Sequence, residues 1–460
     1  MAIVLCERQD EINKDLLNQL SENTVVFSSD YYAGKSFIKQ QASSEYEYYY
    51  LYRNKLYSLE KSEDIKYLQR VFLSGDDYTE AKTFNEFLTN VSRIKGLKQW
   101  LFYPMIIQLE HTNRCNARCI MCGHANVDKR KCFDMADHTF SKIESLLPFC
   151  RYVGLHGYGE PFLAKNLIEK FELYKKYGVR LYANTNLSYL PDAYIPYITE
   201  MFDEINVSID GFTKSTFEFI RQGLIFEKVT ENFKTLTERC PNVTLNIHAT
   251  LMRQNILEAP MAIEFAYQNG VKKVVFNEMI PLDANGNHDD SICKYPAVTS
   301  FMLESAINRA VELGVKVEFP HKLIGEYSAD DIQQQIDEVK KVNAEESLCK
   351  REPTIKENGL LFNRKPLTKD SVAFSGVRCK GICDVFQQQI YVDADGTMAA
   401  CCVDGYHSIG NINDFEDIEE YWASDQVRLL RESFEEGTLP AICRQCNYVY
   451  LNNLKHLSIL

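Results

Sequence analysis

The sequence lacks any long apolar run, because no window approaches the ~20 uninterrupted apolar residues that a transmembrane helix needs. It also lacks an excess of positive charge, since 51 Lys and Arg residues stand against 64 Asp and Glu residues for a net charge of -13. We therefore expect no membrane span and no general affinity for nucleic acid or an anionic membrane surface. The first residues lack the charged start and apolar stretch of a signal peptide, which favours a cytoplasmic protein.

Cysteine, in contrast, is abundant. The chain has 15 cysteines in 460 residues, and without an export signal such a count favours metal binding or catalysis over disulfides. Two groups are close in sequence, one at residues 115–122 and one at residues 379–446. The remaining six are scattered, and we expect most of them to be small buried apolar residues: Cys6, Cys132, Cys150, Cys240, Cys293 and Cys349.

From residue 105 onward, short apolar runs alternate with amphipathic stretches. Strands are predicted over 105–112, 152–159, 179–186, 204–210, 243–252 and 273–280, with helices between them. Buried strands separated by helices predict consecutive βαβ units. The fold class is therefore α/β, with a parallel sheet that is open or closed into a barrel.

Chemistry in such sheets gathers at the carboxyl ends of the strands. Unusual polar segments follow four successive predicted strands: HTNRCNARCIMCGH at 111–124, GYGEP at 157–161, NTN at 184–186 and SIDG at 208–211. We therefore expect these four segments to meet at one edge of the sheet and to build a site there.

Two further regions flank the alternating pattern. Residues 1–100 contain a predicted hairpin at 45–59 followed by helical periodicity, so we expect a small α+β accessory region. The charged stretch of residues 328–346 breaks the alternation. It predicts a solvated helix within a helical linker of residues 321–378.

The spacing Cys-x3-Cys-x2-Cys places Cys115, Cys119 and Cys122 on one loop. Four thiolates close a structural zinc or iron-sulfur site, whereas three leave one coordination position open. Half of a zinc site is one interpretation of these residues. The other is a four-iron cubane held at three corners, whose fourth iron takes an outside ligand.

With this motif on the loop after the first strand, residues 105–320 resemble the radical S-adenosylmethionine (SAM) superfamily. The resemblance implies a partial (β/α)6 barrel over residues 101–320 and a free iron chelated by the amino and carboxylate groups of SAM. It also implies that one electron from the reduced cluster cleaves SAM to methionine and a 5'-deoxyadenosyl radical. Met121 takes the place of the family's apolar residue beside the adenine.

GYGEP is similar to the family's Gly-Gly-Glu-Pro motif, with Tyr158 in place of the second glycine. The resemblance assigns Gly157 and Gly159 to close approach of the backbone, and Glu160 or nearby carbonyls to the SAM ammonium group. Taken alone, the segment is also compatible with an ordinary turn.

The same resemblance matches four more residues to ligand contacts: Asn184, Ser208, Asp210 and Arg221. Asn184 and its neighbour Asn186 end the third strand and are assigned to the ribose or methionyl group. Arg221 suits the two oxygens of the SAM carboxylate. Simpler alternatives stay open, because Asp210 could cap the next helix and Arg221 could be a solvated charge.

Residues 383–402 predict a hairpin with an Asp-Gly turn and cysteines on its returning strand. Together with Trp422, residues 379–460 resemble the SPASM or twitch modules that hold auxiliary clusters in many radical SAM enzymes. The resemblance implies a second four-iron cluster on four thiolates: Cys383, Cys401, Cys443 and Cys446. We favour the shorter twitch type with one auxiliary cluster, and a zinc ribbon on the same thiolates is the alternative.

These resemblances imply two 4Fe-4S clusters, SAM and an electron donor such as flavodoxin or ferredoxin. They imply an enzyme that abstracts hydrogen from its substrate, most readily in the maturation of a ribosomally synthesised peptide by crosslinking, epimerisation or oxidation. Residues 1–100 would then recognise the peptide leader, unless they are a packing extension.

Two other functions stay open. The first is a dehydrogenase or epimerase of a sugar, aminocyclitol or other small molecule, and the second is a non-catalytic iron-sulfur or zinc protein. Epimerisation would need a cysteine that returns a hydrogen atom, for which the candidates are Cys293, Cys379 and Cys402.

Overall fold

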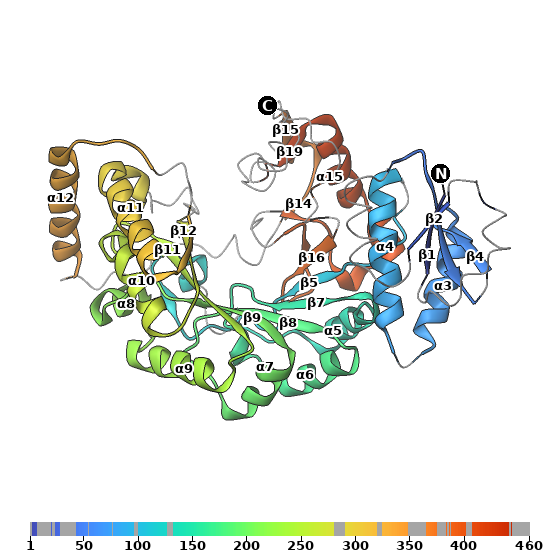
Figure 1. Cartoon of the computed structure of the whole chain (residues 1–460), viewed down its shortest axis with the longest axis horizontal. Coiled ribbons are helices and arrows are strands. Elements are labelled where there is room, and N and C mark those ends of the chain that lie inside the picture. Colours follow the sequence, from blue (N-terminus) through green and yellow to red (C-terminus); the bar gives the residue numbers. More distant parts are fainter. Residues whose placement is uncertain are drawn as a thin grey trace.

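Figure 1 shows the computed structural model of the chain, with a central sheet, a small sheet near the N-terminus at one end and helix α12 at the other. The structure describes residues 2–6, 20, 24–27, 43–53, 55–75, 77–95, 100–126, 132–279, 290–319, 324–347, 365–374, 383, 386, 388–401, 407–440 and 443. Among these residues, no helix is both long enough and apolar enough to cross a bilayer.

The central sheet has nine strands in the order β13-β12-β11-β9-β8-β7-β5-β16-β17. The six predicted strands and the short β13 lie side by side in parallel: β5 (Ile106–Leu109), β7 (Tyr152–Leu155), β8 (Arg180–Thr185), β9 (Phe202–Ser208), β11 (Thr244–Leu251), β12 (Lys273–Glu278) and β13 (Lys316–Glu318). Over the described residues this sheet runs from β13 to β17 without closing. The predicted α/β class and partial barrel are thus confirmed.

Helices cover one side of this sheet (Figure 1). They are α5 (Asp137–Glu144), α6 (Leu167–Lys176), α7 (Ile195–Met201), α8 (Lys214–Ile220), α9 (Phe226–Arg239), α10 (Ala259–Gln268) and α11 (Pro296–Leu313). Along β8, Leu181 and Ala183 are fully buried, whereas Tyr182 and Asn184 on the opposite face are half-buried. The core therefore lies on the helix-covered face, and the other face carries polar side chains.

The described residues from 383 to 443, called the C-terminal module below, extend the central sheet. The predicted hairpin is present as β16 (Gln389–Val392) and β17 (Met398–Ala399), which pair antiparallel. β16 also pairs in parallel with β5, placing Ile390 opposite Ile107. The sequence predicted the hairpin but gave no sign that it would join the core sheet.

Two further strand pairs connect the predicted linker to this module. β14 (Lys365–Pro366) pairs with β18 (His407–Ser408), and β15 (Val372–Phe374) pairs with β19 (Thr438–Pro440). Residues 365–374 therefore contribute to the C-terminal fold, together with α14 (Ile418–Ala423) and α15 (Asp425–Glu436). The domain boundaries at 100, 320 and 378 stay predictions.

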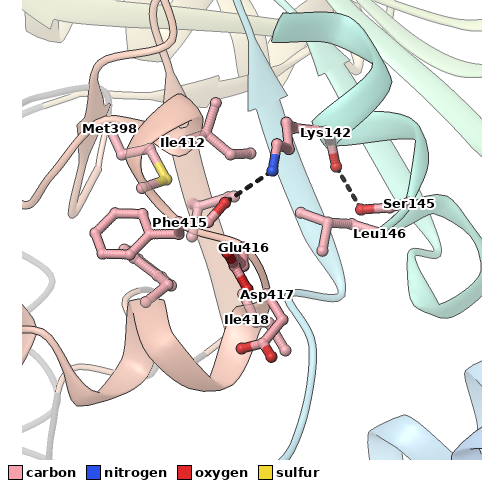
Figure 2. A pocket seen from close by; sticks show the side chains of 11 residues that line it. Lys142, Ser145, Leu146, Met398, Ile412, Phe415, Glu416, Asp417 and Ile418 are labelled. Carbon is pink, nitrogen blue, oxygen red and sulfur yellow. Dashed lines mark hydrogen bonds between the residues drawn. The ribbon is translucent and has the colours of Figure 1, made fainter. Parts of the chain in front are cut away.

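The C-terminal module is fixed to the core by side chains. Trp422 is buried and donates its indole N–H to the carbonyl of Phe102 at 2.7 Å. Figure 2 shows Lys142 of α5 donating to the carbonyl of Phe415, at 3.0 Å. Beside this contact lies a cavity of about 30 Å³, which is also lined by the buried Tyr421. The hydroxyl of Tyr421 has no hydrogen-bond partner among the described residues, so we expect a bound water there.

The N-terminal region is a four-stranded sheet in the order β2-β1-β3-β4. Its strands are β1 (Ala2–Cys6), β2 (Thr24–Phe27), β3 (Glu47–Tyr52) and β4 (Lys55–Ser58). β3 and β4 form the predicted hairpin, whereas β1, which pairs in parallel with β2 and β3, was not predicted. Two helices follow, α3 (Ser62–Leu73) and α4 (Thr79–Lys95).

Helix α4 fixes this region to the core. The side chain of Asn85 accepts from the backbone N–H of Tyr103 at 2.7 Å and donates to the carbonyl of the same residue at 2.9 Å. Lys82 donates to the carbonyl of Gly178 at 2.7 Å, just beyond the end of α6. Burial of the Lys82 side chain lowers the pKa of its amino group to about 8. These hydrogen bonds from α4 to the core hold the N-terminal sheet in its orientation.

Helix α12 (Ala329–Ser347) is the helix predicted at 328–346, and most of its residues are exposed or half-buried. It is nevertheless anchored at two points. Gln335 accepts from the backbone N–H groups of Ala297 and Val298 at the start of α11, at 2.9 and 3.1 Å. Near its other end, Glu346 pairs with the buried Arg253 at 2.5 Å.

Candidate active site

The three clustered cysteines lie on the loop that follows β5. Cys119 is buried in β6 (Arg118–Cys119), which pairs antiparallel with β10 (Arg221–Gln222) so that Cys119 stands opposite Arg221. Cys115 and Cys122 are half-buried. The short β6–β10 ribbon therefore holds the middle cysteine against Arg221 and leaves the outer two partly accessible.

Burial controls the protonation of the thiols in this loop. It raises the pKa of Cys115 to about 12 and also raises that of Cys119, although the charge of Arg221 acts in the opposite direction on both. Metal ligation requires thiolates, so a metal bound by these residues would displace their protons.

Among the described residues, no three His, Cys, Asp or Glu side chains form a group that could hold one metal ion. Three thiolates on one loop are the ligand set that a four-iron cubane with one open corner takes.

Arg221 and Asp210 form a buried ion pair at this site. Arg221 Nη2 lies 2.7 Å from Asp210 Oδ2, and the Asp210 side chain has no exposed surface. Asp210 Oδ1 accepts from the backbone N–H of Thr250 at 2.6 Å, and Arg221 Nη1 lies 3.9 Å from Cys119 Sγ. The solvated-charge interpretation of Arg221 is wrong. The N-cap interpretation of Asp210 is also wrong, because Thr213 caps α8.

The Arg221 guanidinium has one N–H donor that forms no hydrogen bond with the described residues. Arg221 Nε is buried and has no hydrogen-bond partner among the described residues, as is also true of Asn113 Nδ2 two residues before Cys115. A buried donor without a partner costs free energy, so each is a position at which a bound oxygen or nitrogen is expected. Both donors lie beside the cysteine loop, where a cofactor would satisfy them.

The GYGEP loop packs directly on the segment that leads into the cysteines. A Cβ added to Gly159 would lie 2.1 Å from the carbonyl oxygen of Thr112 and 2.8 Å from Asn113 Cα. One added to Gly157 would lie 2.5 Å from Glu110 Cγ. Gly159 therefore lies against the chain's own backbone and Gly157 against the Glu110 side chain, and the roles of both glycines toward SAM stay predictions.

Glu160 is buried and bonded to the end of β8. Its carboxylate accepts from the hydroxyl of Thr185 and from the backbone N–H of Asn186, the latter at 2.7 Å. Burial raises the pKa of Glu160 to about 7, and the hydrogen bond from Thr185 acts in the opposite direction. Asn186 in turn lies 3.9 Å from Cys115 Sγ and donates to Asn116 at 3.1 Å. Through Asn186, the second and third predicted segments meet the first.

The other predicted contacts lie on two sides of this site. Asn184 belongs to a ladder on the polar face of the sheet, in which Asn206 donates to Asn184 and Asn246 donates to Asn206, both at 3.0 Å. Ser208 is half-buried at the end of β9 on that same face. Met121 is half-buried and packs against an apolar cluster formed by Ile120, Ile220, Met252 and Met279. The roles of Asn184, Ser208 and Met121 toward SAM stay predictions.

Three of the four predicted auxiliary ligands are described. Cys383, Cys401 and Cys443 are all half-buried, whereas Cys446, Cys379 and Cys402 lie outside the described residues. The auxiliary ligand set therefore stays a prediction. Cys293 is exposed, and its thiol lies 3.0 Å from Glu278 Oε1 at the end of β12.

Sequence reasoning missed Glu110, the buried residue directly after β5. Its Oε1 accepts from the backbone N–H groups of Tyr158 and Gly159 at 2.6 and 3.1 Å, and its Oε2 accepts from that of Ala394 at 3.2 Å. An acidic residue at the end of an apolar strand was the available signal, since a carboxylate is rarely buried without partners.

Comparisons with known proteins agree with this geometry. The sequence profile of the radical SAM superfamily matches residues 109–266, and that of the SPASM iron-sulfur cluster-binding domain matches residues 383–447. The chain contains a radical SAM domain followed by a SPASM domain. SAM and 4Fe-4S clusters are accordingly its cofactors. The choice between one and more auxiliary clusters stays a prediction.

Two curated relatives match part of the radical SAM chain. A tungsten-containing aldehyde ferredoxin oxidoreductase cofactor-modifying protein from Pyrococcus furiosus is 24% identical over 185 residues, which are 38% of this chain and 52% of the relative. A probable GTP 3',8-cyclase from Methanothermobacter thermautotrophicus is 25% identical over 198 residues, covering 42% and 62%. The chain thus spans little more than half the length of these relatives.

A solved radical SAM structure has a similar fold. The structure described as native anSMEcpe with bound AdoMet aligns with a TM-score of 0.50 at 16% identity, over 76% of this chain and 88% of that one. At this identity the likeness concerns the fold alone. It is consistent with the open parallel sheet and with a C-terminal module beside it.

A methyl group at Gly159 should disturb this radical SAM site, because both neighbours of the added Cβ are backbone and cannot swing away. We expect Gly159→Ala to lower the free energy of unfolding by ~1–3 kcal/mol, measured by urea denaturation of the anaerobic protein. Gly75→Ala is the matched control, since its Cβ would lie 3.9 Å from the nearest atom. We expect a change within ~0.5 kcal/mol for the control, and equal losses in both variants would contradict the packing argument.

Proposed function

We propose that this chain is an enzyme that reductively cleaves SAM to a 5'-deoxyadenosyl radical and abstracts hydrogen from a ribosomally synthesised peptide. The observation that carries the first part is the buried Arg221 beside Cys119, within a loop of three cysteines. When bound and reduced, the 4Fe-4S cluster supplies the electron for SAM cleavage. The protein's own contribution is to hold, orient and neutralise the charged groups around it.

Two charged residues fit the two ends of the SAM methionyl group. Arg221 has a buried Nε–H without a partner, which suits a carboxylate oxygen. Burial raises the pKa of Glu160 to about 7, so this carboxyl group changes its charge near neutral pH. An ammonium group placed beside it would favour the ionised form. Asp210 keeps the guanidinium oriented and compensates its charge in a buried site.

Two features support a peptide as the substrate. The polar face of the sheet carries side chains that both donate and accept, including the ladder of Asn184, Asn206 and Asn246. Backbone amides of a peptide offer the same two kinds of group. In the N-terminal sheet, β4 pairs only with β3 among the described residues, and an extended peptide can add to such an edge.

The radical chemistry is tested by anaerobic reconstitution with iron and sulfide, reduction with dithionite and addition of SAM. We expect 5'-deoxyadenosine and methionine in equal amounts, and an iron content of about eight per chain for two four-iron clusters. A protein that holds iron and sulfide but forms no 5'-deoxyadenosine would refute the proposal. About four irons with zinc would instead support a zinc ribbon in the C-terminal module.

The substrate class is tested by co-expressing this gene with any short open reading frame that its genomic neighbourhood contains and determining the mass of each peptide. A mass change that requires the three clustered cysteines supports peptide maturation. Unchanged peptides, together with 5'-deoxyadenosine formation stimulated by a sugar or aminocyclitol, would favour the small-molecule alternative.

A further inference from the structure

Glu110 connects three parts of the protein that are far apart in sequence. It directly follows β5, and its backbone N–H donates to the carbonyl of Val392 in β16 at 3.0 Å. One carboxylate oxygen accepts from Tyr158 and Gly159 of the GYGEP loop. The other accepts from Ala394, in the turn that joins β16 to β17. Both oxygens are therefore engaged, one by each module.

The packing around this carboxylate leaves little room for another arrangement. A Cβ on Gly157 would lie 2.5 Å from Glu110 Oε1, so only glycine lets the loop reach it. On the other side, the turn of residues 393–396 is closed by a hydrogen bond from Gly396 N–H to the carbonyl of Asp393, at 2.9 Å. Glu110 and Ala394 are both buried, so water does not compete for these hydrogen bonds.

The turn itself is held in place by asparagines of the C-terminal module and, through one of them, by helix α5. Gly396 has φ +88, and a Cβ there would lie 2.6 Å from Asn413 Nδ2 and 2.8 Å from Asn411 Oδ1. Asn413 also donates to Thr139 of α5 at 3.2 Å. A shift of this turn would therefore move the N–H group of Ala394 relative to Glu110.

We propose that Glu110 is a positioning residue that couples the C-terminal module to the SAM-binding loop, so that docking of the 393–396 turn sets the position of GYGEP. This inference rests on the proposed function in assigning GYGEP to SAM. Burial, with a further contribution from Asp393, raises the pKa of Glu110 to about 7, which indicates that its ionised form depends on these three N–H donors.

The first test is Glu110→Gln, which has nearly the same shape. A glutamine can accept with only one end, and its NH₂ group would face an N–H donor at the other. We expect the dissociation constant for SAM, measured by anaerobic equilibrium dialysis, to rise at least about tenfold. The SAM-induced change in the electron paramagnetic resonance spectrum of the reduced cluster should need correspondingly more SAM. At saturating SAM we expect kcat for 5'-deoxyadenosine formation to stay within about twofold of that of the unsubstituted protein. A residue that only positions the SAM-binding loop affects SAM binding and therefore KM.

The second test breaks the same link from the C-terminal side. Gly396→Ala should raise the SAM dissociation constant about threefold, although this residue lies outside the SAM loop. When Glu110→Gln and Gly396→Ala are combined, their effects on the SAM dissociation constant should not be additive in free energy, because both substitutions break the same connection. Gly437→Ala is the control: this residue ends α15 at φ 76, so the variant strains the same module away from the turn, and SAM binding should be unchanged.

Each outcome is decisive for the coupling. An unchanged SAM dissociation constant in Glu110→Gln would overturn the proposal. Weaker binding in Glu110→Gln with no effect of Gly396→Ala, or with additive effects, would also overturn it, since Glu110 would then act within the core alone. Dialysis does not depend on turnover, so a wild-type protein that binds SAM without cleaving it would refute the proposed reaction and leave this test intact.

Discussion

We expect the simultaneous replacement of Cys115, Cys119 and Cys122 by alanine to abolish 5'-deoxyadenosine formation. The reason is that, in the proposed function, this loop holds the cluster that activates SAM. The expected loss is complete, because the triple variant lacks every thiolate that would hold this cluster. The auxiliary cluster should survive, so iron should fall from about eight to about four per chain. Iron analysis and chromatography of the products on the same reconstituted sample check both expectations.

A matched control is Cys240→Ala. Cys240 is buried in the helix layer, where its sulfur accepts from the hydroxyl of Thr199 at 3.3 Å, and it belongs to neither group of clustered cysteines. We expect full iron content and full activity from this variant. If the triple variant still cleaved SAM, these three cysteines would not belong to the active site, whatever the iron content of the variant.

Asp210→Ala should destabilise the protein strongly, because it leaves the Arg221 guanidinium buried without its partner. Truncating one member of a buried ion pair costs ~3–5 kcal/mol, since the remaining charge has lost both water and its counterion. The Asp210 side chain is fully buried and that of Arg221 is 10% exposed, so solvent cannot make up the difference. Denaturation of the anaerobic protein by urea gives the change in unfolding free energy.

A second substitution separates the charge effect from simple loss of packing. Asp210→Ala combined with Arg221→Met removes both charges, and the double variant should be more stable than the sum of the single losses predicts. The exposed pair Arg239–Asp192 is the control, with side chains 48% and 87% exposed, and Asp192→Ala should cost less than about 1 kcal/mol. Additive losses at Arg221 and Asp210 would contradict the importance of the pair.

The elements that periodicity and spacing describe well were predicted correctly. Strands such as β8 and β11 carry alternating or continuous apolar positions, and the helices between them have one apolar face, so the parallel sheet followed from local patterns. The meeting of the cysteine loop, GYGEP and Asn186 followed from a general property of parallel sheets. These features depend on residues near each other in the chain or on topology alone.

Long-range pairings were not predictable in the same way. The attachment of β16 to β5 joins residues about 280 positions apart, and neither sequence carries a mark of its partner. The bond from Ala394 to Glu110 depends on that attachment, so the link between the two modules could not be inferred from the residue type. The pairing of Arg221 with Asp210 likewise required the β6–β10 ribbon, which consists of two-residue strands too short for any periodic signal.

The position of β16 has a consequence for how the protein folds. β5 is the first strand of the parallel core in the chain, and β16, which covers its outer edge, is synthesised after all the other parallel strands of the sheet. Until then β5 presents an open edge, which is a template for pairing with other chains. Such a distant closure also slows folding, because the loop-closure entropy is lost before the contacts form. We expect chains truncated before residue 389 to aggregate and not to accumulate as a soluble core.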